Sequence, residues 1–295
     1  MLVRLCFAFL IAVSFGSAQS LTDRYSAFGT MFVPQFASAP FPHPLRAGGH
    51  TYGGKTFPAA FHYSDSTVAI FVPKGFRATE TADIVIYFHG WYNSIDSSCA
   101  QFSLIEQFCE SGKNALFVFP EGPKHSPDSF GGRMEEKDGL KTLVSDVLQY
   151  LQEKNVLKEG KAGRIILAGH SGAYRVIAHC LMRGGMTGSI TDVILFDALY
   201  GHTEKFAYWI DRYKGRFINI YTDDGGTKNE TLNLMADLDG WGIPYAAAED
   251  SVVTRQFLQQ HRLLFIHTDL THNEVIAKRR QFREYLSTSA LLPIK

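Results

Sequence analysis

The sequence carries no excess of charge of either sign. Its 29 lysine and arginine residues balance 29 aspartate and glutamate residues, so the formal net charge is zero at pH 7. Proteins that bind nucleic acids or anionic membrane surfaces usually display clustered positive charge, which attracts phosphate groups. We therefore expect neither nucleic acid nor an anionic membrane as a partner.

Long hydrophobic runs are also scarce. One run covers residues 5–15, after the basic Arg4 and before a Gly-Ser-Ala triplet that ends at Ala18. This pattern is typical of a secretory signal peptide, and the run is too short to span a bilayer permanently. We predict a signal peptide over residues 1–18, cleaved near Ala18, and a secreted or periplasmic chain without stable membrane insertion. A buried N-terminal helix is the alternative interpretation.

Cysteine is rare, with four residues in the whole chain. Cys6 lies in the apolar run, which leaves Cys99, Cys109 and Cys180, and an odd number is not a disulfide framework. Cys99 and Cys109 fall in one predicted helix, where they would stand about 15 Å apart, too far for a disulfide. Unless that helix is broken, we expect buried thiols or a single pairing that involves Cys180.

Metal-binding spacing, repeats and low-complexity tracts are absent as well. His43, His50 and His62 lie close together in the sequence but lack the spacing of metal ligands. We therefore expect no metal and no other cofactor. A hydrophobic content of 45% in 295 residues favours one large globular domain with a substantial core.

The N-terminal part differs in composition from the rest. Residues 19–55 are rich in proline, glycine and phenylalanine, so we predict an irregular extension that packs on the body through Phe32, Phe36 and Phe41. Residues 56–295 are predicted to form the single domain.

Strand and helix patterns alternate along that domain. Two runs flanking a turn at residues 64–66 predict an antiparallel hairpin of residues 59–63 and 67–73. Apolar runs then predict buried strands, and three- and four-residue periodicity predicts helices between them. This order is typical of a mostly parallel sheet with an N-terminal antiparallel hairpin and helices on both faces. The strands are expected at residues 82–88, 115–120, 164–167, 192–196, 217–221 and 263–266, and the helices at 98–111, 140–151, 173–183, 203–213, 230–239 and 273–287.

The most informative motif follows the strand at residues 164–167. Gly169-His170-Ser171-Gly172-Ala173 places a serine between small residues, directly before a predicted helix. This is the context of a nucleophile elbow, in which a sharp turn projects the serine hydroxyl from the sheet. Ala173 stands where the usual pattern has a glycine. An ordinary β–α turn is the alternative interpretation.

A serine nucleophile needs a base and donors for the developing oxyanion. Two histidines follow the last predicted strand, and we favour His272, in the loop before the final helix, over His267, at the end of the strand. A His-Gly-Trp turn after the strand at residues 82–88 favours the backbone N–H of Trp91 as one oxyanion donor. Gly172, the residue after the serine, is expected to supply the other.

The acid that orients the base has three candidates. Asp197 directly follows an apolar strand, where a lone carboxylate needs a partner. Asp223 and Asp224 end the next strand, but they stand before two glycines in a sequence typical of an exposed turn. We favour Asp197 and keep Asp224 or Asp223 as the alternative.

From about residue 58 onward, this combination resembles the α/β-hydrolase superfamily of serine hydrolases, whose triads follow the chain order Ser, Asp, His. Most members take the acid from the strand of Asp223 or Asp224, whereas pancreatic-lipase-like members take it from the position of Asp197. The short body resembles secreted esterases of the polyhydroxybutyrate-depolymerase and feruloyl-esterase type. The resemblance implies a Ser-His-Asp carboxylic-ester hydrolase that forms an acyl-enzyme.

The resemblance also bears on the substrate. Residues 198–216, where this superfamily often inserts a cap, hold one predicted helix, which implies no large cap domain and an open site for polymeric or aromatic esters. An aromatic rim of substrate-binding residues is expected from Trp91, Tyr92, Tyr174 and Tyr200. Glu135 and Glu136, in the long irregular segment 121–138, are expected to be solvated. A peptidase or amidase with the same triad and a non-catalytic binding module on the same scaffold remain alternatives.

Overall fold

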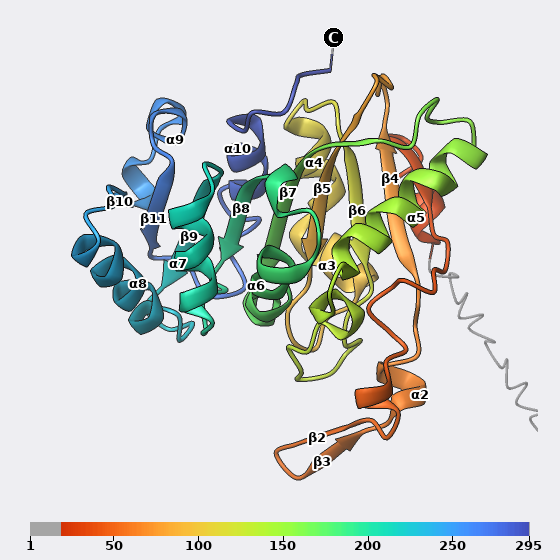
Figure 1. The fold of residues 1–295 in the computed structure, drawn as a ribbon, viewed down its shortest axis with the longest axis horizontal. Coiled ribbons are helices and arrows are strands. Elements are labelled where there is room, and N and C mark those ends of the chain that lie inside the picture. Colours follow the sequence, from red (N-terminus) through yellow and green to blue (C-terminus); the bar gives the residue numbers. More distant parts are fainter. Residues whose placement is uncertain (1–18, 295) are drawn as a thin grey trace, which may run out of the picture.

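The computed structural model describes residues 19–294, in which a large sheet lies between two layers of helices (Figure 1). Within these residues the sheet has nine strands in the order β1-β4-β6-β5-β7-β8-β9-β11-β10. The strands from β6 to β10 run parallel, while β4 is antiparallel to β6 and β1 is antiparallel to β4. The strands are β1 (Gly29–Phe32), β4 (Val68–Pro73), β6 (Leu116–Pro120), β5 (Ala82–Phe88), β7 (Ala162–His170), β8 (Ile190–Phe196), β9 (Arg216–Thr222), β11 (Leu263–Thr268) and β10 (Ala246–Glu249).

Helices cover both faces of this sheet because the central strands are apolar on both sides, as in β5 and β8. Helices α5 to α8 pack on one face, and α3, α4 and α10 pack on the other. The mostly parallel sheet with antiparallel strands at its N-terminal end is therefore confirmed. The helices are α1 (Leu21–Arg24), α2 (Ala59–His62), α3 (Ile95–Phe102), α4 (Leu104–Glu110), α5 (Gly139–Glu153), α6 (Tyr174–Arg183), α7 (Thr203–Arg212), α8 (Lys228–Gly240), α9 (Arg255–Gln260) and α10 (Gln281–Ser287).

Several predicted elements were wrong in detail. Residues 59–62 form helix α2 instead of a strand, and the antiparallel partners of β4 are β1 and β6. The predicted helix 98–111 is two helices, because Ser103 adopts a left-handed φ of 48° between α3 and α4. The last helix begins only at Gln281, after a series of turns, and β10 and α9 were not predicted.

The N-terminal extension is more ordered than predicted. Its β1 is a strand of the central sheet, and residues 50–57, which reach past its predicted end at residue 55, form a separate antiparallel hairpin of β2 (His50–Tyr52) and β3 (Lys55–Phe57). Phe32 and Phe36 each pack edge-on against Tyr150 of α5, with ring centroids 5.8 Å apart. Phe41 is fully buried in a small cluster with Phe57, Tyr63 and Phe130.

Polar contacts fix the extension to the long segment 121–138. The Arg46 guanidinium donates to Asp128 at 2.6 Å, and His43 lies 3.0 Å from Glu136. Glu135 is 9% exposed and not solvated as predicted, because it forms a two-point ion pair with Arg175 of α6 at 2.7 and 2.9 Å. The segment is therefore held between the extension and α6.

The three described cysteines are free thiols. Cys99 and Cys180 are fully buried, and burial raises the pKa of Cys109 to about 12, so these thiols are not reactive nucleophiles at neutral pH. No helix among residues 19–294 has both the length and the apolar character needed to cross a membrane. The predicted signal peptide and Cys6 lie outside the described residues.

The ion pair between Asp192 and Arg216 ties β8 and β9 to the end of α10. Both side chains are nearly buried, and the guanidinium donates to Asp192 at 2.6 Å, to the Tyr285 carbonyl at 2.7 Å and to Thr288 at 2.9 Å. We predict that Arg216→Ala lowers the free energy of unfolding by about 3–5 kcal/mol, because it leaves a buried carboxylate unpaired.

The matched control is Arg212→Ala, which removes an exposed pair with Asp211 and should cost at most about 1 kcal/mol. Urea denaturation of both variants measures the difference. Equal losses in the two variants would contradict this role of Arg216.

Candidate active site

The sequence around Ser171 folds as a sharp strand–helix turn. Strand β7 ends at His170, a single 3-10 turn covers Ser171–Ala173, and α6 begins at Tyr174. Ser171 has a φ of 55°, a left-handed conformation that is costly for a residue with a Cβ and is typical of functional sites. A Cβ on Gly90 would stand 2.5 Å from Cβ and 3.1 Å from Oγ of Ser171, so only glycine fits beside the serine.

Asp197 follows β8 and is fully buried. It accepts hydrogen bonds from the Thr222 hydroxyl at 2.8 Å, from the Thr222 amide at 3.2 Å and from the Thr227 hydroxyl. Nδ1 of His272 donates a further hydrogen bond to it at 2.6 Å. Four donors therefore surround one carboxylate at the carboxyl end of the sheet.

These donors decide the charge of Asp197. Burial alone would raise the pKa of this carboxyl group, because it disfavours the charged form. The hydrogen bonds from His272, Thr227 and Thr222 outweigh burial and hold the pKa below its ordinary value. Asp197 is therefore an anion at neutral pH, and it orients the His272 ring through Nδ1.

His272 lies in the loop after β11, as predicted, and its side chain is 27% exposed. Two aromatic rings, those of His170 and Tyr200, lie near both His272 and Ser171. The His170 ring, next to the serine in sequence, lies 4.5 Å from the His272 ring, and the Tyr200 ring, beside the Ser171 side chain, lies 6.3 Å from it. Ser171, His272 and Asp197 therefore gather at the carboxyl ends of β7, β8 and β11.

His170 holds the two halves of this group together. Its Nε2 donates to the main-chain carbonyl of His272 at 2.8 Å, so it links the strand that carries the serine to the loop that carries the histidine. Burial, helped by the nearby His272, lowers the pKa of His170 to about 3. The ring is therefore neutral, and its proton sits on the nitrogen that faces the carbonyl.

The alternative residues lie elsewhere. Asp223 and Asp224 are exposed in the turn after β9, and Asp223 pairs with Lys228 at 2.5 Å. His267 lies between the ends of β10 and β9, 2.8 Å from Glu249 and 3.2 Å from Asp223. The structure thus brings Asp197 together with His272, and it groups His267 with Asp223.

The His-Gly-Trp turn after β5 lies against the serine turn. A Cβ on Gly172 would stand 2.6 Å from Cδ1 of Trp91, so the indole covers Gly172. The Trp91 indole donates to the Ser129 hydroxyl at 2.8 Å, which fixes its orientation. Within residues 19–294, neither the backbone N–H of Trp91 nor that of Gly172 has a hydrogen-bond acceptor.

The predicted aromatic rim divides into two groups. Tyr174 and Tyr200 lie together, 5.9 Å between centroids, on the side of His272. Trp91 lies on the side of Gly172 and contacts Tyr52 of the β2–β3 hairpin, with centroids 5.0 Å apart. Tyr92 has a left-handed φ of 58° and is 56% exposed.

Sequence reasoning missed Tyr52, Ser129, Thr222 and Thr227. The Gly-Gly pair after Tyr52, flanked by short strand-like segments, was a hairpin pattern that pointed to the first of these. The two threonines had no comparable pattern, because their role appears only when the turn after β9 folds over Asp197.

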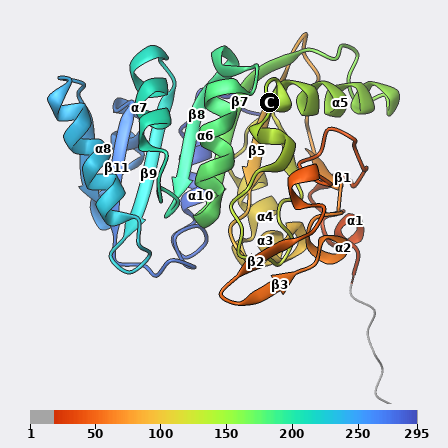
Figure 2. The same ribbon diagram turned by 60° about the horizontal axis from the view of Figure 1, so that its bottom comes forward.

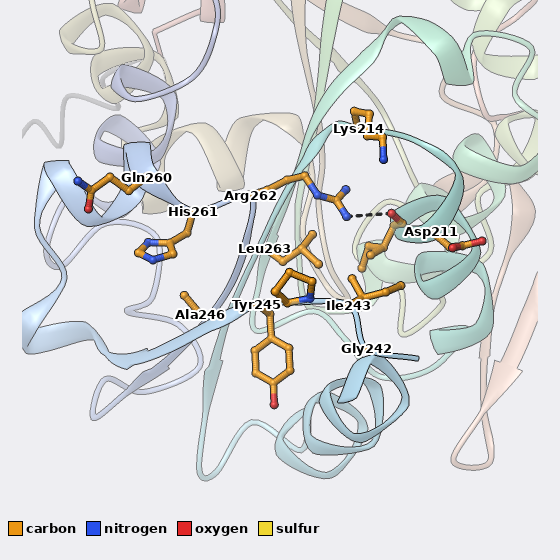
Figure 3. Close-up of a pocket in the computed structure, with 12 residues that line it drawn as sticks. Asp211, Lys214, Gly242, Ile243, Tyr245, Ala246, Gln260, His261, Arg262 and Leu263 are labelled. Atoms are coloured by element: carbon orange, nitrogen blue, oxygen red, sulfur yellow. Dashed lines mark hydrogen bonds between the residues drawn. The ribbon is translucent and has the colours of Figure 1, made fainter. Parts of the chain in front are cut away.

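Figure 3 shows a pocket of about 510 Å³ that lies away from these residues. Its lining includes Ala246 and Leu263, the first residues of β10 and β11, so it opens at the opposite edge of the sheet. Its half-buried cation, Arg262, already donates hydrogen bonds to the carbonyls of Ile210, Tyr213 and Gly215. No group of three or more potential metal ligands gathers among residues 19–294.

No protein-family model matches the sequence, and no curated protein matches it. Solved structures do resemble it. A mutant of the feruloyl esterase module from Clostridium thermocellum, complexed with sinapinate, has a TM-score of 0.55 at 12% identity over 96% of each chain. The fluorophosphonate-binding serine hydrolase F from Staphylococcus aureus, with substrate bound, has a TM-score of 0.52 at 9% identity, over 88% of this chain and 98% of that one.

A ferulic acid esterase from Anaeromyces mucronatus, in complex with ferulic acid, has a TM-score of 0.50 at 13% identity, over 97% of this chain and 98% of that one. At these identities the likeness shows the fold. The chain therefore has the α/β-hydrolase fold that was predicted from its sequence.

The neutral state of His170 is directly measurable. With a folded-state pKa of about 3, its ring should stay unprotonated from pH 8 down to about pH 4, whereas an ordinary histidine titrates near 6.5. Carbon-13 NMR of labelled histidine rings, with His170→Phe to assign the resonance, follows the titration. A His170 midpoint near pH 6.5 would contradict the buried hydrogen bond to His272.

Proposed function

We propose that this protein is a serine hydrolase that cleaves carboxylic esters through an acyl-enzyme, with Ser171 as nucleophile, His272 as base and Asp197 as the orienting acid. One observation carries the proposal. The fully buried Asp197 accepts a 2.6 Å hydrogen bond from Nδ1 of His272. This pair lies close to Ser171, a serine in a strained turn, because His170 and Tyr200 neighbour both the pair and the serine. This is the constellation that activates a serine hydroxyl.

The first half-reaction would acylate the serine. Oγ of Ser171 attacks the ester carbonyl carbon and passes its proton to Nε2 of His272, while Asp197 stabilises the imidazolium that forms. The carbonyl oxygen becomes an oxyanion, to which the backbone N–H groups of Trp91 and Gly172 would donate hydrogen bonds. The C–O bond to the alcohol then breaks, and His272 returns the proton to the departing oxygen.

Water would complete the cycle. Nε2 of His272 takes a proton from water, whose oxygen attacks the acyl carbon bound to Ser171. The second oxyanion forms in the same place, the bond to Oγ breaks, and the proton returns to Ser171. The products are one carboxylic acid and one alcohol, and no cofactor takes part in these steps.

The proposed substrate is an ester that carries an aromatic group, including esters attached to a polymer. Trp91 on the side of Gly172, and Tyr174 and Tyr200 on the side of His272, offer aromatic faces for stacking. The segment between β8 and β9 holds only α7, so no inserted cap covers the serine. Two structural neighbours were solved with sinapinate and ferulic acid, which are aromatic acids.

We also propose that residues 1–18 act as a signal peptide that directs export of the chain.

Exchange of the candidate acids tests the assignment of Asp197. We predict that Asp197→Asn lowers kcat for ester hydrolysis at least about a hundredfold, because His272 loses its orienting charge. Asp223→Asn is the matched control, since Asp223 pairs with Lys228 and His267 instead. Steady-state kinetics on one soluble ester compare them, and near-normal turnover by the Asp197 variant would reject this acid.

A covalent probe tests the nucleophile itself. We expect an alkyl fluorophosphonate to phosphonylate Oγ of Ser171 with loss of fluoride, which intact and peptide mass spectrometry detects. Ser171→Ala should abolish the labelling. Folded protein that never reacts would support the non-catalytic binding module. Comparison of ester and anilide hydrolysis then separates an esterase from a peptidase or amidase, and preference for the anilide would overturn the esterase.

A further inference from the structure

The β2–β3 hairpin contributes little to the stability of the core. It forms a two-stranded sheet of its own, and of its strand residues Phe57 alone is buried. Isolated two-stranded hairpins are marginally stable in water. In Figures 1 and 2 the hairpin projects from the body on the side where the parallel strands have their carboxyl ends, which is also the side of Ser171. We therefore look for a role of the hairpin at the site of Ser171 and not in the stability of the core.

The base of the hairpin is nevertheless rigidly held. Arg46, just before β2, donates to Asp128 at 2.6 Å and lies 4.7 Å over the Phe130 ring. Phe57, at the end of β3, packs in the buried cluster that contains Phe130. The residues that hold Arg46 and Phe57, Asp128 and Phe130, both belong to the segment 121–138. Ser129 of the same segment also orients the Trp91 indole. One segment therefore positions both the hairpin and Trp91.

The tip of the hairpin places Tyr52 against Trp91. Gly53 and Gly54, with φ of 55° and 76°, form the tight turn, and Tyr52 is the last residue of β2 before it. The Tyr52 ring lies edge-on to Trp91, at 5.0 Å and 72°, yet it is 49% exposed. The two rings thus form an aromatic corner, which is open on one side and lies beside Gly172.

The corner lies on the acyl side of the proposed reaction. The leaving alcohol must take its proton from His272, so it lies near His272 and Tyr200, whose rings are 6.3 Å apart. We place the acyl group on the opposite side of the serine from His272, toward Gly172, which Trp91 covers. A planar ring in that position stacks on one ring of the corner and meets the edge of the other.

We propose that the β2–β3 hairpin is a specificity arm, whose Tyr52 forms with Trp91 the binding corner for a planar aromatic acyl group. The inference rests on the proposed esterase function and deepens it, because it assigns the acyl side of the site to a segment of the N-terminal extension. An aliphatic acyl chain makes no stacking contact with the corner and gains less from it.

The test uses two methyl esters that differ only in the acyl group, methyl cinnamate and methyl butyrate. Tyr52→Ala should lower kcat/KM for methyl cinnamate about tenfold more than for methyl butyrate, chiefly through KM. Tyr52→Phe keeps the ring and should restore most of the loss. Tyr208→Ala, which removes an exposed tyrosine of α7, should leave both values unchanged.

Inhibition by the free acids gives a second readout. The inhibition constant of cinnamate, but not that of butyrate, should rise about tenfold in Tyr52→Ala. Equal effects on both acyl groups, or no effect on either, would overturn the specificity arm while the esterase stands. Wild-type protein that hydrolyses neither ester, and that carries no fluorophosphonate label, would instead overturn the proposed function.

Discussion

The hydrogen bond between the buried Asp197 and Nδ1 of His272 is the interaction on which the rest of the site depends. A carboxylate with no exposed surface has a large desolvation cost, and it persists here because Thr222, Thr227 and His272 together supply four donors. The same donors hold the pKa of Asp197 below its ordinary value. The fold thus keeps Asp197 charged, and this charge fixes the tautomer of His272. The end of β9 and the turn after it contribute by placing the donors of Thr222 and Thr227 against the carboxylate.

Backbone strain is concentrated at the same place. Ser171 and Asp197 both have left-handed φ values, of 55° and 43°, and both stand directly after a strand of the parallel sheet. The Asp197 turn directs its carboxylate at the His272 ring, and His170, next to Ser171, donates to the main-chain carbonyl of His272. The apolar packing of the strands on both faces opposes relaxation of these turns. The core therefore holds in place the two turns that carry Ser171 and Asp197.

Much of the fold was readable from the sequence, because buried parallel strands are nearly continuous apolar runs and amphipathic helices such as α5 carry a clear periodicity. Ser171 and Asp197 were predicted because each stands close after an apolar strand pattern, and His272 was predicted because it lies in the loop between the last strand and the final helix. The prediction failed where tertiary contacts decide the local structure. The strand pairing of Gly29–Phe32 and the hydrogen bonds of the threonines around Asp197 depend on partners distant in sequence. Glu135 was assigned to solvent because Arg175, its partner, lies 40 residues away.

The N-terminal extension and the segment 121–138 form an outer support for the site, since they carry Tyr52 and Ser129 to Trp91. That support is useful only if Asp197 and His272 are bonded as described. Proton NMR at low temperature observes this directly, because a hydrogen bond between an imidazole N–H and a buried carboxylate moves the proton far downfield of the amide region. We expect such a resonance in the native protein, retained in Asp223→Asn and lost in Asp197→Asn. Its presence in Asp197→Asn, or its loss in Asp223→Asn, would show that the resonance does not come from a hydrogen bond between His272 and Asp197.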